Sequence, residues 1–229
     1  ARQGSVIKLL HSGQWEAGYN STPTDFLGAV EFSSDDTSGS GLGGAGARAA
    51  IRAPVLDAYN NVGLSFETGG TRAERMRIDH NGRVTTPNQP SFRAIYSGSA
   101  ISLTNTYFPF NTVSGSYNSF DIGNNFRTSA SPSSGTNAHS YTAPVAGRYY
   151  FVVSTICNTT NNNGAWYLRK NGGAVIEQHT TQTSSGWTAI TMTGIINCAA
   201  GDYVNVWVGG TTLNLYGVAW GHFSGYLIG

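Results

Sequence analysis

The sequence has few charged residues and no long apolar run, and each shortage excludes a class of protein. Charged residues make up 11% of the 229 positions, and 13 Lys and Arg nearly balance 12 Asp and Glu, so the net charge is +1. A nucleic-acid binder usually carries a basic stripe, so we expect no nucleic-acid partner. No stretch approaches the roughly 18 to 20 consecutive apolar residues of a membrane helix, so we expect no membrane insertion.

Cysteine is also scarce, since Cys157 and Cys198 are the only two. They are too few for a disulfide framework, and neither has a second Cys or a His at zinc-ligand spacing. Each lies in an apolar run, "FVVSTIC" or "GIINC", which favours buried free thiols. A disulfide between them stays open as the alternative, because two strands of one sandwich can approach within bonding distance.

Glycine, serine, threonine, asparagine and aromatic residues dominate what is present. The chain has 30 Gly and 12% aromatic residues, a composition typical of short strands joined by tight turns, so the sequence predicts an all-β fold. From Phe92 onward, strand signals recur about every ten to twelve residues, the spacing of a sandwich or jelly roll. The chain also begins at Ala1 without Met, which favours a processed chain or a fragment.

Residues 1–88 differ from the rest in having short strand signals between long polar loops. Asn81-Gly82, flanked by alternating apolar residues, predicts a hairpin. Because these loops surround few apolar core residues, we expect a small β domain that needs other chains to complete its core. The segment 85–92, "TTPNQPSF", contains two prolines and is the predicted linker to a second domain, residues 89–229.

Catalytic and cofactor motifs are lacking. Residues 39–44 fit the G-x-G-x-x-G dinucleotide pattern, but Pro54 follows too soon for the helix that such a site requires, so we expect a loop. No G-x-S-x-G elbow occurs, and the second domain has only three acidic residues, Asp121, Glu177 and Asp202. A glycosidase needs two carboxylates facing each other across the sugar. Asp202 is more simply explained as a turn residue in "AAGD", which removes it as a candidate. We therefore expect no enzyme activity, no cofactor and no metal.

Two strands are apolar on both faces, which predicts a second burial partner. In "RYYFVVSTIC" one face carries Tyr149, Phe151, Val153 and Cys157, and "DYVNVWV" shows the same pattern. One face would fill the sandwich and the other would meet a neighbouring subunit. The predicted subunit contacts are residues of these two strands and one residue of the closing strand, Tyr226. They are Tyr150, Val152, Ile156, Tyr203, Trp207 and Tyr226.

Three loop regions combine amide or hydroxyl side chains with an aromatic residue, the composition of recognition surfaces. They are "NTTNNNGAWY", "HTTQTSSGW" and "GGTTLNLYGVAW". Trp166 and Trp220 lie at strand edges, where a core or interface role is the alternative. The predicted receptor contacts are Asn161, Asn162, Asn163, Trp166, Trp187, Tyr216 and Trp220.

Four motifs in order make the second domain resemble a C1q-type globular head of the complement and tumour-necrosis-factor jelly-roll superfamily. They are "YTAPVAGRYYF" (141–151), "LRKNG" (168–172), "AAGDYVNVWV" (199–208) and "FSGYLI" (223–228). The resemblance implies a trimeric jelly roll whose last strand pairs beside its first, near Phe92. Phe223, Gly225 and Leu227 would then face the core, with Tyr226 and Ile228 toward a neighbouring chain.

The segment 63–84, "GLSFETGGTRAERMRIDHNGRV", is similar to one that recurs in bacteriophage tail-fibre and tail-spike proteins. The two resemblances together imply a homotrimeric phage tail-fibre tip, located on the virion and acting outside the cell. Residues 1–88 would form its shaft or collar, joined to upstream fibre or other virion proteins, and the head would bind a host cell-surface receptor such as a polysaccharide. The alternatives are a structural trimerisation or decoration protein of a virion, and a secreted C1q-like lectin or cytokine-type binding module.

Overall fold

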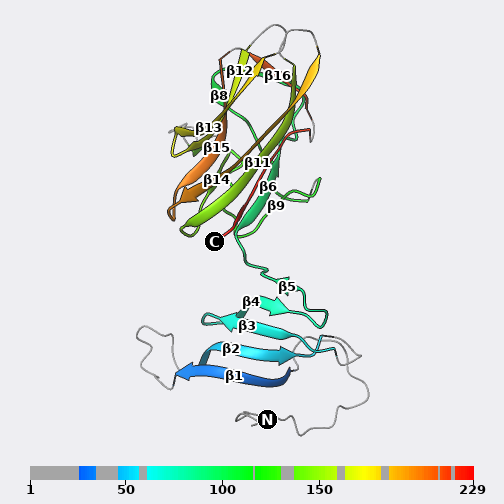
Figure 1. Cartoon of the computed structure of the whole chain (residues 1–229), viewed down its shortest axis with the longest axis vertical. Coiled ribbons are helices and arrows are strands. Elements are labelled where there is room, and N and C mark those ends of the chain that lie inside the picture. The colour runs from blue at the N-terminus through cyan, green and yellow to red at the C-terminus, as the bar shows by residue number, and fades with distance from the viewer. Residues whose placement is uncertain are drawn as a thin grey trace, which may run out of the picture. The chain divides into compact units, whose positions relative to one another are not determined.

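The structure is a computed structural model of the chain (Figure 1). It describes residues 26–34, 46–56, 61–115, 117–129, 137–158, 163–181, 186–210, 212–217 and 220–229. The chain divides into two compact units, Ala1–Asn88 and Gln89–Gly229, and this boundary lies within the segment predicted as the linker. Nearly all regular structure in the described ranges is β-strand, so the predicted all-β class is confirmed.

The first unit is a single antiparallel sheet of five strands in chain order (Figure 1). Its strands are β1 (Phe26–Ser34), β2 (Gly46–Pro54), β3 (Leu64–Thr68), β4 (Ala73–Ile78) and β5 (Val84–Thr85). The predicted hairpin joins β4 to β5: Gly82 has a φ of 79°, and its N–H donates to the Asp79 carbonyl at 2.9 Å. Glycine adopts this backbone conformation without the steric cost of a Cβ.

One face of this sheet is apolar. Strand register aligns Val30, Ile51, Phe66 and Met76 across β1 to β4, and a second row joins Leu64, Ile78 and Val84. Phe32 on the same face is 59% exposed. A sheet normally buries its apolar face against a second layer, and the described residues of this unit form only one.

The opposite face carries charged residues that pair with one another. The Arg52 guanidinium lies 2.7 Å from Glu31 and 3.2 Å from Glu67, and Arg72 also contacts Glu31 at 2.7 Å. Glu31 lies within β1, between the two arginines. Among the described residues of this unit, the charged face is occupied by its own ion pairs and the apolar face has no second layer.

The second unit is a sandwich of two antiparallel sheets (Figure 1), which we call sheets I and II. Sheet I has the order β7-β16-β11-β17-β6-β9, and β14 pairs with the other edge of β11. Its strands are β6 (Ser91–Ile95), β7 (Ile101–Leu103), β9 (Phe120–Asp121), β11 (Gly147–Asn158), β14 (Trp187–Cys198), β16 (Leu213–Leu215) and β17 (His222–Leu227). Sheet II has the order β10-β15-β12-β13, with β8 on β15.

The strands of sheet II are β8 (Thr106–Tyr107), β10 (Ser140–Thr142), β12 (Asn163–Lys170), β13 (Gly173–Thr181) and β15 (Tyr203–Gly210). The chain crosses between the sheets after β7, β8, β9, β10, β11, β13, β14 and β15, which is the winding of a jelly roll. The predicted jelly-roll sandwich is therefore confirmed. Its last strand, β17, pairs with β6 as expected, with Gly225 opposite Phe92.

The core lies between the two sheets and is rich in aromatic rings. Phe223 of β17 is fully buried and lies 4.9 Å from the Phe92 ring, edge to face. The predicted inward face of β11 is confirmed, because Tyr149, Phe151, Val153 and Cys157 have no exposed surface. Cys157 and Cys198 are both buried and free, so the expected free thiols are confirmed and the alternative disulfide does not form.

Candidate functional site

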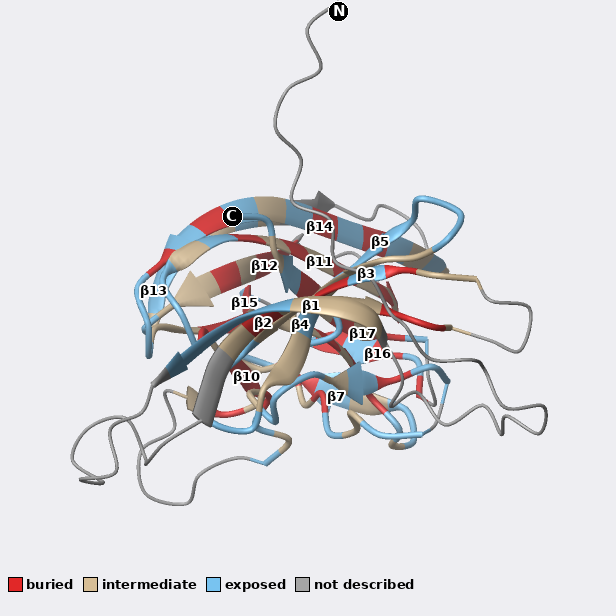
Figure 2. Ribbon diagram, turned by 90° about the horizontal axis from the view of Figure 1, so that it is seen from below, coloured by how far each residue is buried: buried red, intermediate tan, exposed pale blue. Residues whose placement is uncertain are grey.

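The outer face of sheet I carries exposed apolar residues at both ends of β11. Figure 2 shows β14 alternating between buried and exposed residues, as expected of a strand with one face on the core. Its exposed side chains extend the outer face of β11, because Ile195 lies opposite Tyr150, and Ala189 opposite Ile156. Ordinary monomers rarely expose such patches unless the surface binds something.

Three half-exposed aromatic side chains meet at one end of this face, and we call them the aromatic cluster: Trp187, Tyr216 and Trp220. Their exposed fractions are 50%, 45% and 54%. The Trp187 and Tyr216 rings lie 5.0 Å apart at 82°, and the Tyr216 and Trp220 rings lie 5.4 Å apart at 76°. Together with Ile156 they line an open hollow of about 260 Å³.

Backbone contacts fix the position of each ring. Trp187 begins β14 and pairs with Asn158, the last residue of β11. The Tyr216 N–H donates to the Ile156 carbonyl at 3.2 Å. Trp220 precedes Gly221, whose carbonyl accepts from the Tyr96 N–H at 3.2 Å. Trp187 and Tyr216 thus lie at strand ends, which hold side chains more exactly than free loops do, and Trp220 lies two residues before β17.

The structure brings together three of the seven predicted receptor contacts. Trp166 is 0% exposed, so its prediction as a receptor contact is wrong: alternation along β12 points it into the core with Leu168. Asn161 and Asn162 lie outside the described residues, and Asn163 begins β12, where only its backbone is described. Sequence reasoning missed Ile156 as part of this site, because it had been assigned to subunit contact alone.

The predicted subunit contacts lie on two opposite outer faces of the sandwich. Tyr150, Val152, Ile156 and Tyr226 lie on sheet I. Tyr203 and Trp207 lie on β15 in sheet II, so the six residues are divided between the two outer faces. The Trp207 ring is also covered by its own chain, because the Arg169 guanidinium lies 4.0 Å from the ring centroid and Tyr107 packs edge to face at 4.7 Å.

At the other end of the sheet I face, Tyr150 and Tyr226 pack with ring centroids 5.7 Å apart. Tyr226 is 51% exposed, and Ile195, on the other side of Tyr150, is 63% exposed. Sequence reasoning missed Ile195, although alternation in "TMTGIINC" could have placed it on this face. We call Tyr150, Ile195 and Tyr226 the tyrosine end of the face.

The middle of the face is polar. Ser224 of β17 lies opposite Arg93 of β6, and the Ser224 Oγ and Arg93 Nε atoms are buried with no hydrogen-bond partner among the described residues. Burial, assisted by the nearby Arg93 charge, lowers the pKa of His222. Polar atoms buried without partners cost free energy, so this strip suits a contact that supplies hydrogen-bond acceptors.

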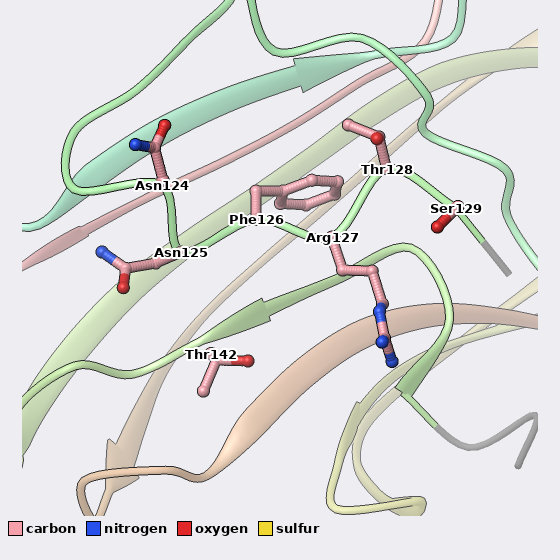
Figure 3. Close-up of a pocket in the computed structure, with 7 residues that line it drawn as sticks. All are labelled: Asn124, Asn125, Phe126, Arg127, Thr128, Ser129 and Thr142. Carbon is pink, nitrogen blue, oxygen red and sulfur yellow. The ribbon is translucent and has the colours of Figure 1, made fainter. Parts of the chain in front are cut away.

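A second hollow, of about 550 Å³, lies beside β10 and has a polar lining (Figure 3). Figure 3 shows the amides of Asn124 and Asn125 on one side and the Arg127 guanidinium on the other, so these groups do not converge on one point. Arg127 already donates to Asn137 Oδ1 at 2.7 Å, and Asn125 donates to the Ile122 carbonyl at 3.1 Å. These contacts give the loop a structural role.

The acidic residues of the head have structural contacts. Asp121 Oδ2 accepts from the Phe126 N–H at 2.7 Å. Hydrogen bonds from the Asn171 side chain and the Ala199 N–H lower the pKa of Asp202, as its predicted turn position implies. Within the described ranges no group of three His, Cys, Asp or Glu side chains could hold a metal ion, and no helix there is long and apolar enough to span a membrane.

The class of protein that this fold defines is an antiparallel jelly-roll sandwich joined to a smaller single-sheet unit. Among solved structures, the chain is similar to the globular domain of zebrafish complement 1qA protein. The two are 16% identical, the match covers 62% of this chain and 98% of that chain, and the TM-score is 0.42. No protein-family model and no curated protein matches the chain.

Proposed function

We propose that this chain is a binding protein without catalytic activity, the distal part of a trimeric viral fibre that attaches to a host cell surface. The observation that carries the proposal is the aromatic cluster, where three half-exposed rings border one hollow. Exposed aromatic side chains held on a rigid scaffold are a common basis of recognition surfaces. The aromatic cluster is therefore assigned as the receptor-binding site of the head.

Assembly into a trimer is supported by two unpartnered surfaces, one in each unit. In the first unit it is the apolar face that contains Phe32 and Val84, which are 59% and 58% exposed. In the head it is the tyrosine end of the sheet I face. Three copies of the chain around one axis would cover such surfaces. The phage-fibre part of the proposal rests on the resemblance of residues 63–84 to tail-fibre segments.

Attachment is tested by incubating the purified full chain with candidate host cells and measuring bound protein, and then competition with virions. Trp187→Ala should abolish most binding, because it removes one wall of the hollow. Tyr117→Ala is the matched control: Tyr117 is a 59% exposed aromatic outside the cluster, and its loss should leave binding unchanged. If the wild-type chain neither binds host cells nor competes with virions, the attachment function is wrong.

A purely structural role is the second candidate, because Ile156 lines the hollow and also lies in the predicted subunit contact. Under this alternative the aromatic cluster packs against another copy of the chain. Sedimentation equilibrium separates the two functions. Under the attachment proposal Trp187→Ala stays trimeric, whereas under the structural alternative it dissociates. A wild-type chain that sediments as a folded 24.2 kDa monomer at micromolar concentration would contradict the trimer.

A further inference from the structure

The walls of the hollow in the aromatic cluster stand nearly at right angles. Tyr216 is the shared ring, and it makes angles of 82° with Trp187 and 76° with Trp220. A flat sugar ring stacks on one aromatic face, and coplanar rings would suit it best. Perpendicular rings instead surround a compact, roughly spherical group from several sides. This is the arrangement of aromatic cages that bind quaternary ammonium ions.

The chemistry of the lining points the same way. Ile156, Trp187, Tyr216 and Trp220 carry no formal charge and few hydrogen-bonding atoms. A primary ammonium group or a sugar hydroxyl placed in this hollow would lose hydrogen bonds to water without replacement. A trimethylammonium group has no N–H to satisfy, and its charge is spread over methyl groups that contact ring faces favourably.

The charge distribution of the sequence adds a second argument. No Lys or Arg follows Lys170, so the stretch that supplies Trp187, Tyr216 and Trp220 has no permanently cationic side chain, and burial lowers the pKa of its His222, which favours the neutral imidazole.

We propose that the aromatic cluster is a cage for the trimethylammonium group of phosphocholine displayed on a cell surface, with the phosphate outside the hollow in solvent. This assignment rests on the proposed attachment function and names its ligand. The backbone contacts of Trp187, Tyr216 and Gly221 hold the rings in place before the ligand arrives, which reduces the entropy lost on binding.

Calorimetric titration of the full chain with phosphocholine tests the cage directly. We expect saturable binding, and no binding of 3,3-dimethylbutyl phosphate, which has the same shape but carries no cationic head group. Trp187→Ala and Trp220→Ala should each weaken phosphocholine binding about fivefold to thirtyfold, the range for loss of one cation–π contact. Tyr216→Phe should bind normally because the ring, not the hydroxyl, forms the wall, and Tyr117→Ala is the matched surface control.

Several results would overturn the cage. Equal binding of the uncharged analogue would show an apolar hollow without cation recognition. Absence of phosphocholine binding by the folded wild-type chain, with its folding verified by near-ultraviolet circular dichroism, would remove the proposal altogether. Phosphatidylcholine vesicles and a choline-substituted polysaccharide are titrated separately, because both carry the same head group, and binding to neither would also overturn the cage.

Cell attachment distinguishes failure of the cage from failure of the attachment function. If Trp187→Ala abolishes attachment and excess phosphocholine does not compete with the wild-type chain, the cage is wrong and the attachment function stands. If phosphocholine binds the hollow while the chain binds no host cell, the attachment function is wrong and the cage stands.

Discussion

Replacing Phe223 by alanine tests whether the closing strand holds the head together. Phe223 is fully buried, and its ring lies 4.9 Å from Phe92, 5.7 Å from Phe110 and 5.7 Å from Phe151. Deleting a buried phenylalanine ring removes its transfer free energy and leaves a cavity, which together destabilise a domain by about 3 to 5 kcal/mol. The rigid rings around Phe223 are poorly able to collapse into that cavity, so we expect the upper part of this range.

The expected change in melting temperature follows from the size of the head. A unit of roughly 140 residues unfolds with an entropy of about 0.3 kcal/mol/K, so the loss corresponds to a melting temperature about 10 to 17 °C lower. Differential scanning calorimetry at fixed protein concentration measures it. Phe120→Ala is the matched control, since Phe120 is 42% exposed and should cost little. Equal shifts for Phe223→Ala and Phe120→Ala would refute the role of β17 in closing the core.

Three further predictions address the packing, the thiols and one turn. Gly225→Val should lower the melting temperature, because a Cβ at this position would lie only 2.6 Å from the Phe151 ring. Such overpacking typically costs about 1 to 3 kcal/mol. An unchanged melting temperature would contradict this close packing. Burial raises the pKa of Cys157 to about 11 and also raises that of Cys198. A thiol reagent at neutral pH should therefore label neither cysteine until the chain unfolds. Labelling of the folded chain would contradict the burial of these thiols. The folded-state pKa of Asp202 is depressed, so its contribution to stability is present above the usual aspartate pKa and is lost as the pH falls through the depressed value. Asp202→Asn should therefore be less stable than wild type at neutral pH and equal to it in strong acid, as measured by urea unfolding. A stability difference that persists in acid would contradict the dependence of this contribution on the ionised carboxylate.

Local patterns in the sequence predicted the parts of the fold that depend on neighbouring residues. The two-residue period of β11 identified its buried face, and Gly82 identified a hairpin, because each signal is contained within a few consecutive positions. Alternation in "AWYLRK" could also have placed Trp166 in the core beside Leu168. The error came from giving its position beside a polar loop more importance than the strand period.

The sequence could not predict which sheet a strand joins. Alternation shows that Trp207 and Tyr150 both point away from the core, but it does not show that their strands lie in different sheets. For the same reason the sequence, although it predicted Trp187, Tyr216 and Trp220 as contacts, could not predict that they meet in one cluster. Trp187 reaches Tyr216 only because β14 and β16 both pair with β11, and those pairings are long-range properties of the fold.

The sheet I face has room for both a ligand and a subunit contact, and this makes the two separable by mutation. Along β11, Ile156 in the hollow and Tyr150 at the tyrosine end are six residues apart, about 20 Å in an extended strand. Substitutions at this separation normally act independently. We therefore expect Tyr226→Ala to weaken assembly in sedimentation equilibrium without changing phosphocholine affinity at concentrations where the chain is folded. Trp187→Ala should lower the affinity and leave the mass unchanged. If either substitution altered both properties, ligand and neighbouring copies would compete for one surface, and the division of this face into two contacts would be wrong.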